Sequence, residues 1–420
     1  MQLSFATKCR IAAYSIKNSF TKPTFRGYNP NDAKKFYADP NPVLDEMRRN
    51  HQIFFCPQIA AWVCSQDKKE TFDMGRSDKF SLNFSDWRFA PKPIPDDEQN
   101  ALEKLLANLL IVLPSADHMR IRRLVQPAFL PRNVVKMEDA ISRIVDEALE
   151  NATGDFNLVE VSKEVPLKII AELVGVPTNF QREFKGLAEA ILATYMPTEA
   201  PDPALAFEGI RIVKSVIQDR RDNPRDDFIS TLIQTADEDG DRLSIDEVMA
   251  FVASLLTAGP DTTAHFINCV IYTVVQYPEV IAELKADPSL IDNAVIESNR
   301  LNYFAHSGGI RFAKEDVELC GEKIAKGDMI KFNVNTANLD PSVFPDPFTF
   351  DIHRKNLKDA WIFGAGSHFC VGASLAKTIG RIFLQKFIEK VPSPELLGEP
   401  KYEKDFINRK MTCMMIRSHE

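Results

Sequence analysis

The chain has 420 residues, of which 45% are hydrophobic and 26% charged, and its formal net charge is −8. This composition is typical of a globular protein and excludes disordered and collagen-like chains. The acidic balance provides no general basic field for nucleic acid, and no apolar run approaches the roughly 20 residues of a transmembrane segment, so we expect neither.

The seven cysteines are scattered along the chain, and none forms a C-x-x-C pair. An odd number of cysteines without paired spacing argues against a disulfide framework and is typical of a reducing compartment. We therefore expect a cytoplasmic protein.

The first 26 residues are basic, because five cations precede the first acid, Asp32: Lys8, Arg10, Lys17, Lys22 and Arg26. We interpret residues 1–26 as an N-terminal arm that can be flexible, and residues 27–420 as a single domain. A transit peptide or a surface-lying arm has a similar composition, but a solvated arm is the commoner case.

Strand signals before residue 300 are confined to one place. Residues 53–56 and 60–64 are apolar and flank Pro57-Gln58, which predicts a β-hairpin. Residues 80–114 are irregular up to a predicted helix at 102–113, and such a connection is often a lid or a pocket wall, or otherwise a surface insertion. Helices predicted at 184–196 and 205–221 flank a proline-rich segment, so they can form a flap over a pocket or simply pack in a bundle.

Two spaced pairs of polar residues lie on predicted helices. His118 and Arg122 are four apart and share a helix face. Glu297 and Arg300 are three apart, a common helical pair that is worth only tenths of a kcal/mol if exposed. Taken alone, neither pair indicates a function.

A long helix is predicted from Ser244, which forms a capping-box pattern with Glu247, to about Gln276. Its middle contains Gly259 and Pro260, which cost about 1 and 3 kcal/mol relative to alanine inside a helix. Because Pro260 lacks an amide hydrogen, we expect the helix to open there. A tolerated kink in a core helix is one explanation, and a site that needs the opening is the other.

Residues 363–372 read Phe-Gly-Ala-Gly-Ser-His-Phe-Cys-Val-Gly. Gly364 and Gly366 allow a tight turn that can lie close to a flat ligand, and an amphipathic helix is predicted from Val371 onward. The helix N-terminus should favour the thiolate form of Cys370. A thiolate in such a place is a metal ligand or a nucleophile.

Three uses of Cys370 are open at this point. A zinc site needs three or four ligands, and although His368 is near, no second Cys/His pair accompanies it. A catalytic thiol needs an adjacent base, which His368 could supply. A buried structural thiol is the usual fate of a free cysteine.

The spacing of Phe363, Gly366, His368, Cys370 and Gly372 resembles the haem-binding signature of the cytochrome P450 family, the haem-thiolate monooxygenases. The resemblance covers the chain from about residue 27 to the C-terminus and includes two departures, at Pro260 and at Leu339, where an arginine is common. Three further family patterns occur in order: His118-x-x-x-Arg122, Ala258-Gly-x-Asp261-Thr262-Thr263, and Glu297-x-x-Arg300 followed by Arg354.

The resemblance implies a cytochrome P450 fold, which is mainly α with a small β region, and haem b with the Cys370 thiolate as the iron ligand. Thr262 is implied to hydrogen-bond the oxygen being activated, and Asp261 to feed it protons through water. Glu297, Arg300 and Arg354 are implied to be structural and to fix the loop that presents Cys370. The residues implied to contact the cofactor are His118, Arg122, Ala258, Arg311, Phe363, Gly364, His368, Cys370 and Gly372.

The implied reaction inserts one oxygen atom from O2 into an apolar organic substrate, by hydroxylation or O-dealkylation. Electrons would come from NAD(P)H through a ferredoxin-type partner and its reductase, because no flavin or ferredoxin domain fits in this length. A basic face near the cysteine is our hypothesis for the docking of an acidic ferredoxin; it comprises His353, Arg354, Lys355, Lys358, Lys377 and Arg381.

Two other functions use the same cofactor: a peroxide-using haem-thiolate enzyme, and a non-catalytic haem carrier or gas sensor. The substrate itself cannot be named from the sequence, but the expected pocket walls are apolar. They are Trp87, Phe89, Leu109, Ile111, Ile191, Tyr195, Ala258 and a strand at 304–310 that ends at Ile310.

Overall fold

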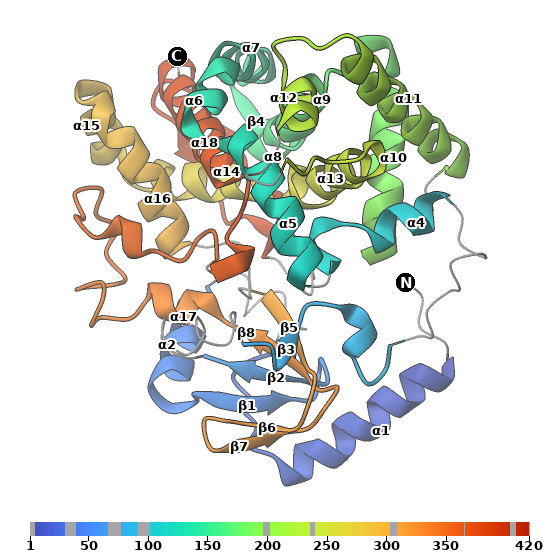
Figure 1. The fold of residues 1–420 in the computed structure, drawn as a ribbon. Helices are drawn as coiled ribbons and strands as arrows, with labels where there is room; N and C mark the ends of the chain where they lie inside the picture. The colour runs from blue at the N-terminus through green and yellow to red at the C-terminus, as the bar shows by residue number, and fades with distance from the viewer. Residues whose placement is uncertain are drawn as a thin grey trace.

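The computed structural model describes residues 5–29, 39–65, 77–90, 101–113, 115–195, 202–235, 240–302, 309–364, 366–403 and 409–419. Figure 1 shows a large helical region and a smaller β-rich region, in which N-terminal strands lie beside strands from late in the chain. The fold is therefore mainly α with a small β region, as the sequence predicts.

Helices make up most of the described chain. The α-helices are α1 (Phe5–Thr21), α2 (Asn41–Asn50), α4 (Ala101–Ala107), α5 (Ser115–Val125), α6 (Pro131–Val134), α7 (Glu138–Ala148), α8 (Leu158–Ser162), α9 (Val165–Val174), α10 (Gln181–Tyr195), α11 (Pro203–Asp222), α12 (Phe228–Gln234), α13 (Ile245–Ala258), α14 (Pro260–Val275), α15 (Pro278–Ala286), α16 (Ile291–Leu301), α17 (Val334–Asn338) and α18 (Ala373–Lys390).

The strands form four small sheets with the orders β1-β2-β8-β5-β3, β4-β12-β9, β6-β7 and β10-β11. Their bounds are β1 (Ile53–Cys56), β2 (Ala61–Cys64), β3 (Phe80–Ser81), β4 (Asp155–Asn157), β5 (Gly309–Ala313), β6 (Val317–Leu319), β7 (Glu322–Ile324), β8 (Met329–Phe332), β9 (Glu395–Leu396), β10 (Lys401–Glu403), β11 (Lys410–Cys413) and β12 (Met415–Arg417).

The predicted hairpin is confirmed as β1 and β2, which pair antiparallel from Ile53 opposite Cys64 to Cys56 opposite Ala61. Every residue of both strands is buried. Because side chains alternate between the faces of a strand, Phe54 and Val63 pack in the main core while Phe55 and Trp62 pack in a second cluster. The sheet is thus covered on both faces.

The N-terminal segment differs from the expected solvated arm, because it forms α1 and packs on this sheet. The Tyr14 hydroxyl donates to Oδ1 of Asp328 at 2.5 Å, and its ring meets the rings of Phe55 and Phe89 edge-on. The half-buried Tyr14 side chain, with these contacts, helps to offset the entropy of ordering the helix.

The long helix predicted from Ser244 to Gln276 is present but divided at Gly259 into α13 and α14. The capping box is confirmed, with Ser244 and Glu247 bonding each other's amides. The amide of Gly259 donates to Leu255, and the amide of Thr263 donates to Gly259, so regular turns flank the break. The expected opening at Pro260 is therefore confined to about one residue.

The prediction of a helix at 102–113 is wrong for residues 108–113. The α4 helix ends at Ala107, where the side-chain amide of Asn108 donates to the carbonyl of Lys104 at 2.8 Å. This bond competes with the helical pattern, and Leu109 is extended before a single 3₁₀ turn, η3 (Leu110–Val112). The apolar pattern of residues 102–113 did not indicate that the helix would end at Ala107.

Three helices pack closely behind the cysteine loop. An added Cβ at Gly380 of α18 would lie 2.7 Å from the Phe266 ring of α14 and 3.1 Å from Val295 of α16. Only glycine allows this approach. The helices predicted at 184–196 and 205–221 are confirmed as α10 and α11, and residues 196–201 lie outside the described residues.

Candidate active site

The cysteine loop connects a 3₁₀ turn, η9 (Gly366–His368), to α18. Gly364 and Gly366 have φ of 70° and 68°, the left-handed region that the sequence led us to expect. The amide of Cys370 donates to the carbonyl of Phe363 at 2.9 Å, which closes the loop. This tight turn fixes the position of the thiol.

Cys370 lies between the 3₁₀ turn and α18 and is accessible to solvent. The protein packed around its sulfur desolvates the thiol and raises its pKa, and the opposing effects of the Gly372 amide and the Arg122 charge are smaller. The Gly372 amide acts in the direction that the sequence predicts, but burial outweighs it. A bound metal ion deprotonates its thiol ligand outright, so the raised pKa is compatible with Cys370 as a metal ligand.

Four basic or imidazole side chains gather beside this loop. The rings of His118 and His368 lie 4.1 Å apart, and Arg122 donates to the carbonyl of Phe369. Burial lowers the pKa of His118 to about 4 and that of His368 to about 3. The charges of His118, Arg311 and Arg122 lower the pKa of His368 further, so the four groups are close neighbours.

Arg311 on β5 completes this group. Burial lowers its pKa to about 10, and the guanidinium donates to the carbonyl of Ile310 at 3.0 Å. Gly309, at φ 131°, makes room for it, because an added Cβ would lie 3.0 Å from Nη1 of Arg311. The sequence analysis did not predict this role of Gly309. The available signal was a glycine two residues before Arg311, where a missing side chain leaves room for the guanidinium.

No Asp or Glu among the described residues contributes to the pKa of any of these four groups, and the Cys370 thiol is the one acidic group found to act on them. At neutral pH the two imidazoles are uncharged, whereas Arg122 and Arg311 are half-buried cations. Two such cations without a carboxylate are costly unless a ligand supplies the negative charge. The two carboxylates of a haem would do so, with the Cys370 sulfur facing the iron. The residues present therefore fit the haem that the sequence resemblance implies.

The second part of the site lies at the break between α13 and α14, at Gly259. Thr262, in the first turn of α14, donates its hydroxyl to the carbonyl of Ala258. Ala258, the last residue of α13, is exposed, whereas residues 248–253 of the same helix are buried. A hydroxyl, an exposed small residue and the adjacent Asp261 therefore occur together where the helix opens.

Asp261 has a partner that sequence reasoning missed. The Nε2 atom of His265, one turn later on α14, lies 3.6 Å from Oδ2 of Asp261. Burial alone would raise the pKa of Asp261, but the His265 side chain and the charge of Lys410 more than offset it and hold that pKa below its usual value. The i, i+4 spacing of Asp261 and His265 was the available signal.

The pair Glu297 and Arg300 is fully buried and joins Arg354, as the family pattern implies. Nε of Arg300 lies 2.6 Å from Glu297, and Nε of Arg354 lies 2.8 Å from it. The two guanidinium groups also donate to backbone carbonyls of residues 338–349. The network thus ties α16 to the chain that leads to Cys370.

The residues expected in the substrate pocket lie in several places. Trp87 and Phe89 pack with Phe312 in a cluster against α1, Leu109 and Ile191 are buried in the main core, and Ile111 is exposed. Ile310 is half-buried on β5, and the side chain of Tyr195 and residues 303–308 lie outside the described residues. A substrate role for these residues stays a prediction.

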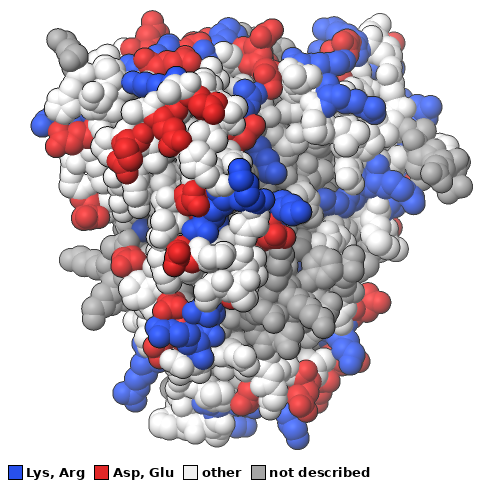
Figure 2. All heavy atoms as spheres, turned by 90° about the vertical axis from the view of Figure 1, so that its left-hand side faces the viewer, with Lys and Arg blue, Asp and Glu red and all other residues white. Residues whose placement is uncertain are grey.

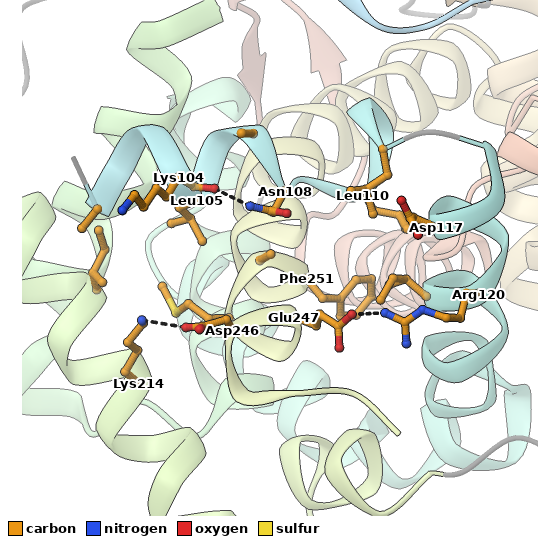
Figure 3. Close-up of a pocket in the computed structure, with 17 residues that line it drawn as sticks. Lys104, Leu105, Asn108, Leu110, Asp117, Arg120, Lys214, Asp246, Glu247 and Phe251 are labelled. Carbon is orange, nitrogen blue, oxygen red and sulfur yellow. Dashed lines mark hydrogen bonds and ion pairs between the residues drawn. The ribbon is translucent and has the colours of Figure 1, made fainter. Parts of the chain in front are cut away.

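A cavity of about 730 Å³ opens between α4, α5, α11 and α13 (Figure 3). Apolar side chains such as Leu105, Leu110 and Phe251 lie beside charged ones, and the Lys214–Asp246 and Arg120–Glu247 ion pairs cross its wall. Phe251 precedes Ala258 by seven residues, about 10 Å along the helix. The cavity therefore lies along the same helix as the break, and Cys370 does not line it.

The expected docking face needs one correction. Arg354 is buried in the Glu297 network and cannot belong to a surface. His353 and Arg381 pair with Glu283 and Glu138, whereas Lys355, Lys358 and Lys377 are exposed. The segment between α17 and α18, orange in Figure 1, lies on the face shown in Figure 2, where Lys and Arg side chains gather near the middle.

Other metal chemistry finds no support in the described part of the chain. There, no three His, Cys, Asp or Glu side chains cluster as zinc would require. All seven cysteines are free thiols. None of the helices that the structure describes combines the length and apolarity that crossing a membrane requires.

Comparison with known proteins agrees with this geometry. Residues 204–392 match the family model described as Cytochrome P450. The chain is 30% identical over 400 residues to the epothilone C/D epoxidase of Sorangium cellulosum, covering 91% of this chain and 93% of that protein. It is 31% identical over 374 residues to the cytochrome P450 monooxygenase PikC of Streptomyces venezuelae, covering 87% of each.

Solved structures show the same likeness. The structure of epothilone D-bound cytochrome P450epoK superimposes with a TM-score of 0.83 at 27% identity, covering 94% of this chain and all of that chain. The cytochrome P450 PksS of Bacillus subtilis superimposes with a TM-score of 0.77 at 24% identity, which shows the shared fold alone.

Proposed function

This chain belongs to the cytochrome P450 family, and on that premise we propose that it inserts one oxygen atom from O2 into an apolar organic molecule. As a family member it is a monooxygenase with a haem-thiolate cofactor. The proposal goes further in naming haem b as that cofactor, hydroxylation or O-dealkylation as the reaction, and NAD(P)H as the electron source. The overall change is R–H + O2 + 2 electrons + 2 protons → R–OH + H2O.

The cofactor would be held by the residues already described. Cys370 would supply the iron ligand, and Arg122, Arg311, His118 and His368 would contact the two carboxylates. A thiolate-ligated haem, when bound, supplies the activation of O2. The support for this assignment is the pair of half-buried arginines, Arg122 and Arg311, whose charges no Asp or Glu of the described chain is found to offset.

Protons would reach the oxygen through Asp261 and Thr262. The carboxylate of Asp261 is half-buried, has a lowered pKa and can pass a proton through water, while the hydroxyl of Thr262 can orient the reacting oxygen. A haem carrier or gas sensor has no use for an acid and a hydroxyl at a helix opening. This pair is the observation that carries the proposed reaction.

The substrate is proposed only as a class. By their names, relatives of this chain act on epothilone C/D and on vitamin D3. The cavity along α13 has an apolar wall next to charged groups, which suits an apolar molecule with a few polar substituents. We propose this cavity as part of the path by which the substrate reaches the helix break.

A ferredoxin-type protein and its reductase are the proposed electron donors. Lys355 and Lys358 precede the cysteine loop in the chain, Lys377 follows it, and all three are exposed. The ammonium of Lys377 lies 5.4 Å from the centre of the Phe363 ring in that loop, and a group of lysines can steer an acidic partner.

The test is the absorption spectrum of the purified protein, reduced under carbon monoxide, followed by NAD(P)H-driven turnover. We expect the strongly red-shifted Soret band of a thiolate-ligated haem, and product formation that requires O2 and a redox partner. An unshifted band in fresh protein would overturn the assignment of Cys370. Turnover driven by peroxide alone, with none from NAD(P)H and O2, would favour the peroxide-using alternative.

A further inference from the structure

Helix α1 exposes a stripe of large apolar side chains. Phe5, Ile16 and Phe20 are 83%, 62% and 85% exposed. Of the nine large hydrophobic side chains that are exposed in the described chain, these three lie on this one helix. Scattered exposed hydrophobics need no explanation, but a contiguous group marks an interaction surface.

The stripe faces away from the body of the protein. At about 100° per residue, Phe5, Ile16 and Phe20 lie within about 60° of the direction opposite Tyr14. Tyr14 holds the inner face through Asp328, Phe55 and Phe89. Cys9 and Ala12, also exposed, lie between the larger side chains. The outer face is therefore apolar over about 22 Å, the distance from Phe5 to Phe20.

Positive charges border this stripe. Lys8 and Lys17 lie on its two sides, by the same helical geometry, and neither forms an ion pair with a described residue. Arg10 and Lys22 instead turn back over the rings of Phe89 and Trp62. No Asp or Glu occurs in the first 31 residues, so α1 itself carries cations and no acid.

We propose that α1 binds the surface of an anionic phospholipid membrane. In this arrangement the helix lies flat in the interface, Phe5, Ile16 and Phe20 enter the headgroup boundary, and Lys8 and Lys17 contact lipid phosphates. An apolar stripe bordered by lysines is the pattern that this mode of binding requires. The helix lies at the outer edge of the β-rich region, away from the helical region (Figure 1), so a membrane can reach it.

A second copy of the chain fits this surface less well. A two-fold contact between α1 helices would bring Lys8 and Lys17 of one copy near the same residues of the other. Repulsion between like charges, with no acid on the helix to offset it, disfavours that contact.

The experiment is co-sedimentation of the full-length, haem-loaded protein with vesicles. One set contains phosphatidylcholine alone, and the other contains about one third phosphatidylglycerol. We expect at least tenfold tighter binding to the anionic vesicles, and a decrease of that preference at high salt.

Two variants test the two parts of the surface. Replacing the apolar side chains (F5Q, I16Q, F20Q) and reversing the charges (K8E, K17E) should each weaken binding to anionic vesicles at least tenfold. The matched controls are F207Q with F348Q, also exposed phenylalanines, and K285E with K401E; these should bind within twofold of the wild type. All positions are exposed, so circular dichroism and the haem spectrum should stay unchanged.

Other outcomes would overturn the inference. Binding that is absent, or equal for both kinds of vesicle, would exclude an anionic membrane as the partner. If light scattering instead shows a dimer that the F5Q, I16Q, F20Q variant abolishes, while vesicles are not bound, the stripe is a contact between two copies.

Discussion

The Nε atom of Arg354 lies 2.8 Å from Oε1 of Glu297, and their side chains are 6% and 0% exposed. The same carboxylate also binds Arg300, so one buried acid holds two guanidinium groups. Removing the acid would leave both cations buried without a counter-charge, which costs about 3–5 kcal/mol.

Glu297→Gln should therefore lower the free energy of unfolding by about 3–5 kcal/mol and reduce the haem content of the purified protein. Denaturant unfolding and the ratio of Soret to protein absorbance measure both effects. The matched control is Glu208→Gln, which breaks an exposed pair of the same spacing with Arg211 and should change little. A Glu297→Gln protein as stable as the wild type would mean that the network contributes no stability.

Arg311→Gln should loosen the cofactor. A hydrogen bond to a charged group is worth about 1.5–3 kcal/mol, so haem should pass to apomyoglobin about tenfold faster or more. Lys314→Gln, an exposed residue one position beyond β5, is the control and should release haem at the wild-type rate. Equal rates for Arg311→Gln and the wild type would show that Arg311 does not bind the cofactor.

Thr262→Ala should uncouple electron use from product formation. Without the hydroxyl, more of the electrons taken from NAD(P)H should end in hydrogen peroxide, while haem binding stays normal. The measurement is peroxide formed per NAD(P)H oxidised. Thr257→Ala is the control, because Thr257 bonds the carbonyl of Ala253 in the same way one turn earlier. A Thr262→Ala enzyme that remains fully coupled would refute the proton-delivery role.

Local signals predicted much of this molecule. The glycines predicted the turn at Gly364 and Gly366, Pro260 predicted the helix break, and two short apolar runs on either side of Pro57-Gln58 predicted the hairpin. Each of these features is decided within a few residues of the chain.

Features that depend on contacts between residues far apart in the chain could not be predicted from local sequence patterns. Tyr14 anchors α1 through Asp328, 314 positions away, so the sequence suggested only a basic arm. The pKa of Cys370 rises because tertiary burial outweighs the helix end that the sequence showed. Arg354 was expected both in the structural triad and on a surface, and only its burial decides between them.

Lys377→Glu should slow electron transfer from an acidic ferredoxin-type partner several-fold at low salt. The lysine is exposed, and its ammonium lies 5.4 Å from the centre of the Phe363 ring at the start of the cysteine loop. The difference should vanish at high salt, where the Debye length falls to about 3 Å. Lys323→Glu on β7 is the control for the same change in net charge, and an equal loss in both variants would argue against a specific docking site.

His265→Asn should shift the pH dependence of coupling to higher pH. In the wild type, burial would raise the pKa of Asp261, but the His265 side chain, 3.6 Å away, holds it below its usual value. The ionised form is thus favoured by the fold. Its contribution to stability is present above the unfolded pKa, about 3.9, and is lost as the pH falls through the lower folded pKa.

Without His265, burial dominates and the pKa of Asp261 rises. As the pH is lowered, product formed per NAD(P)H oxidised should then begin to decline at a higher pH in the variant than in the wild type. Lys410→Gln should shift the profile in the same direction but less, because its effect on Asp261 is purely electrostatic and ranks below that of His265. If the His265→Asn and wild-type profiles coincide, His265 does not set the ionisation of Asp261, and proton delivery must depend on other groups around the helix break.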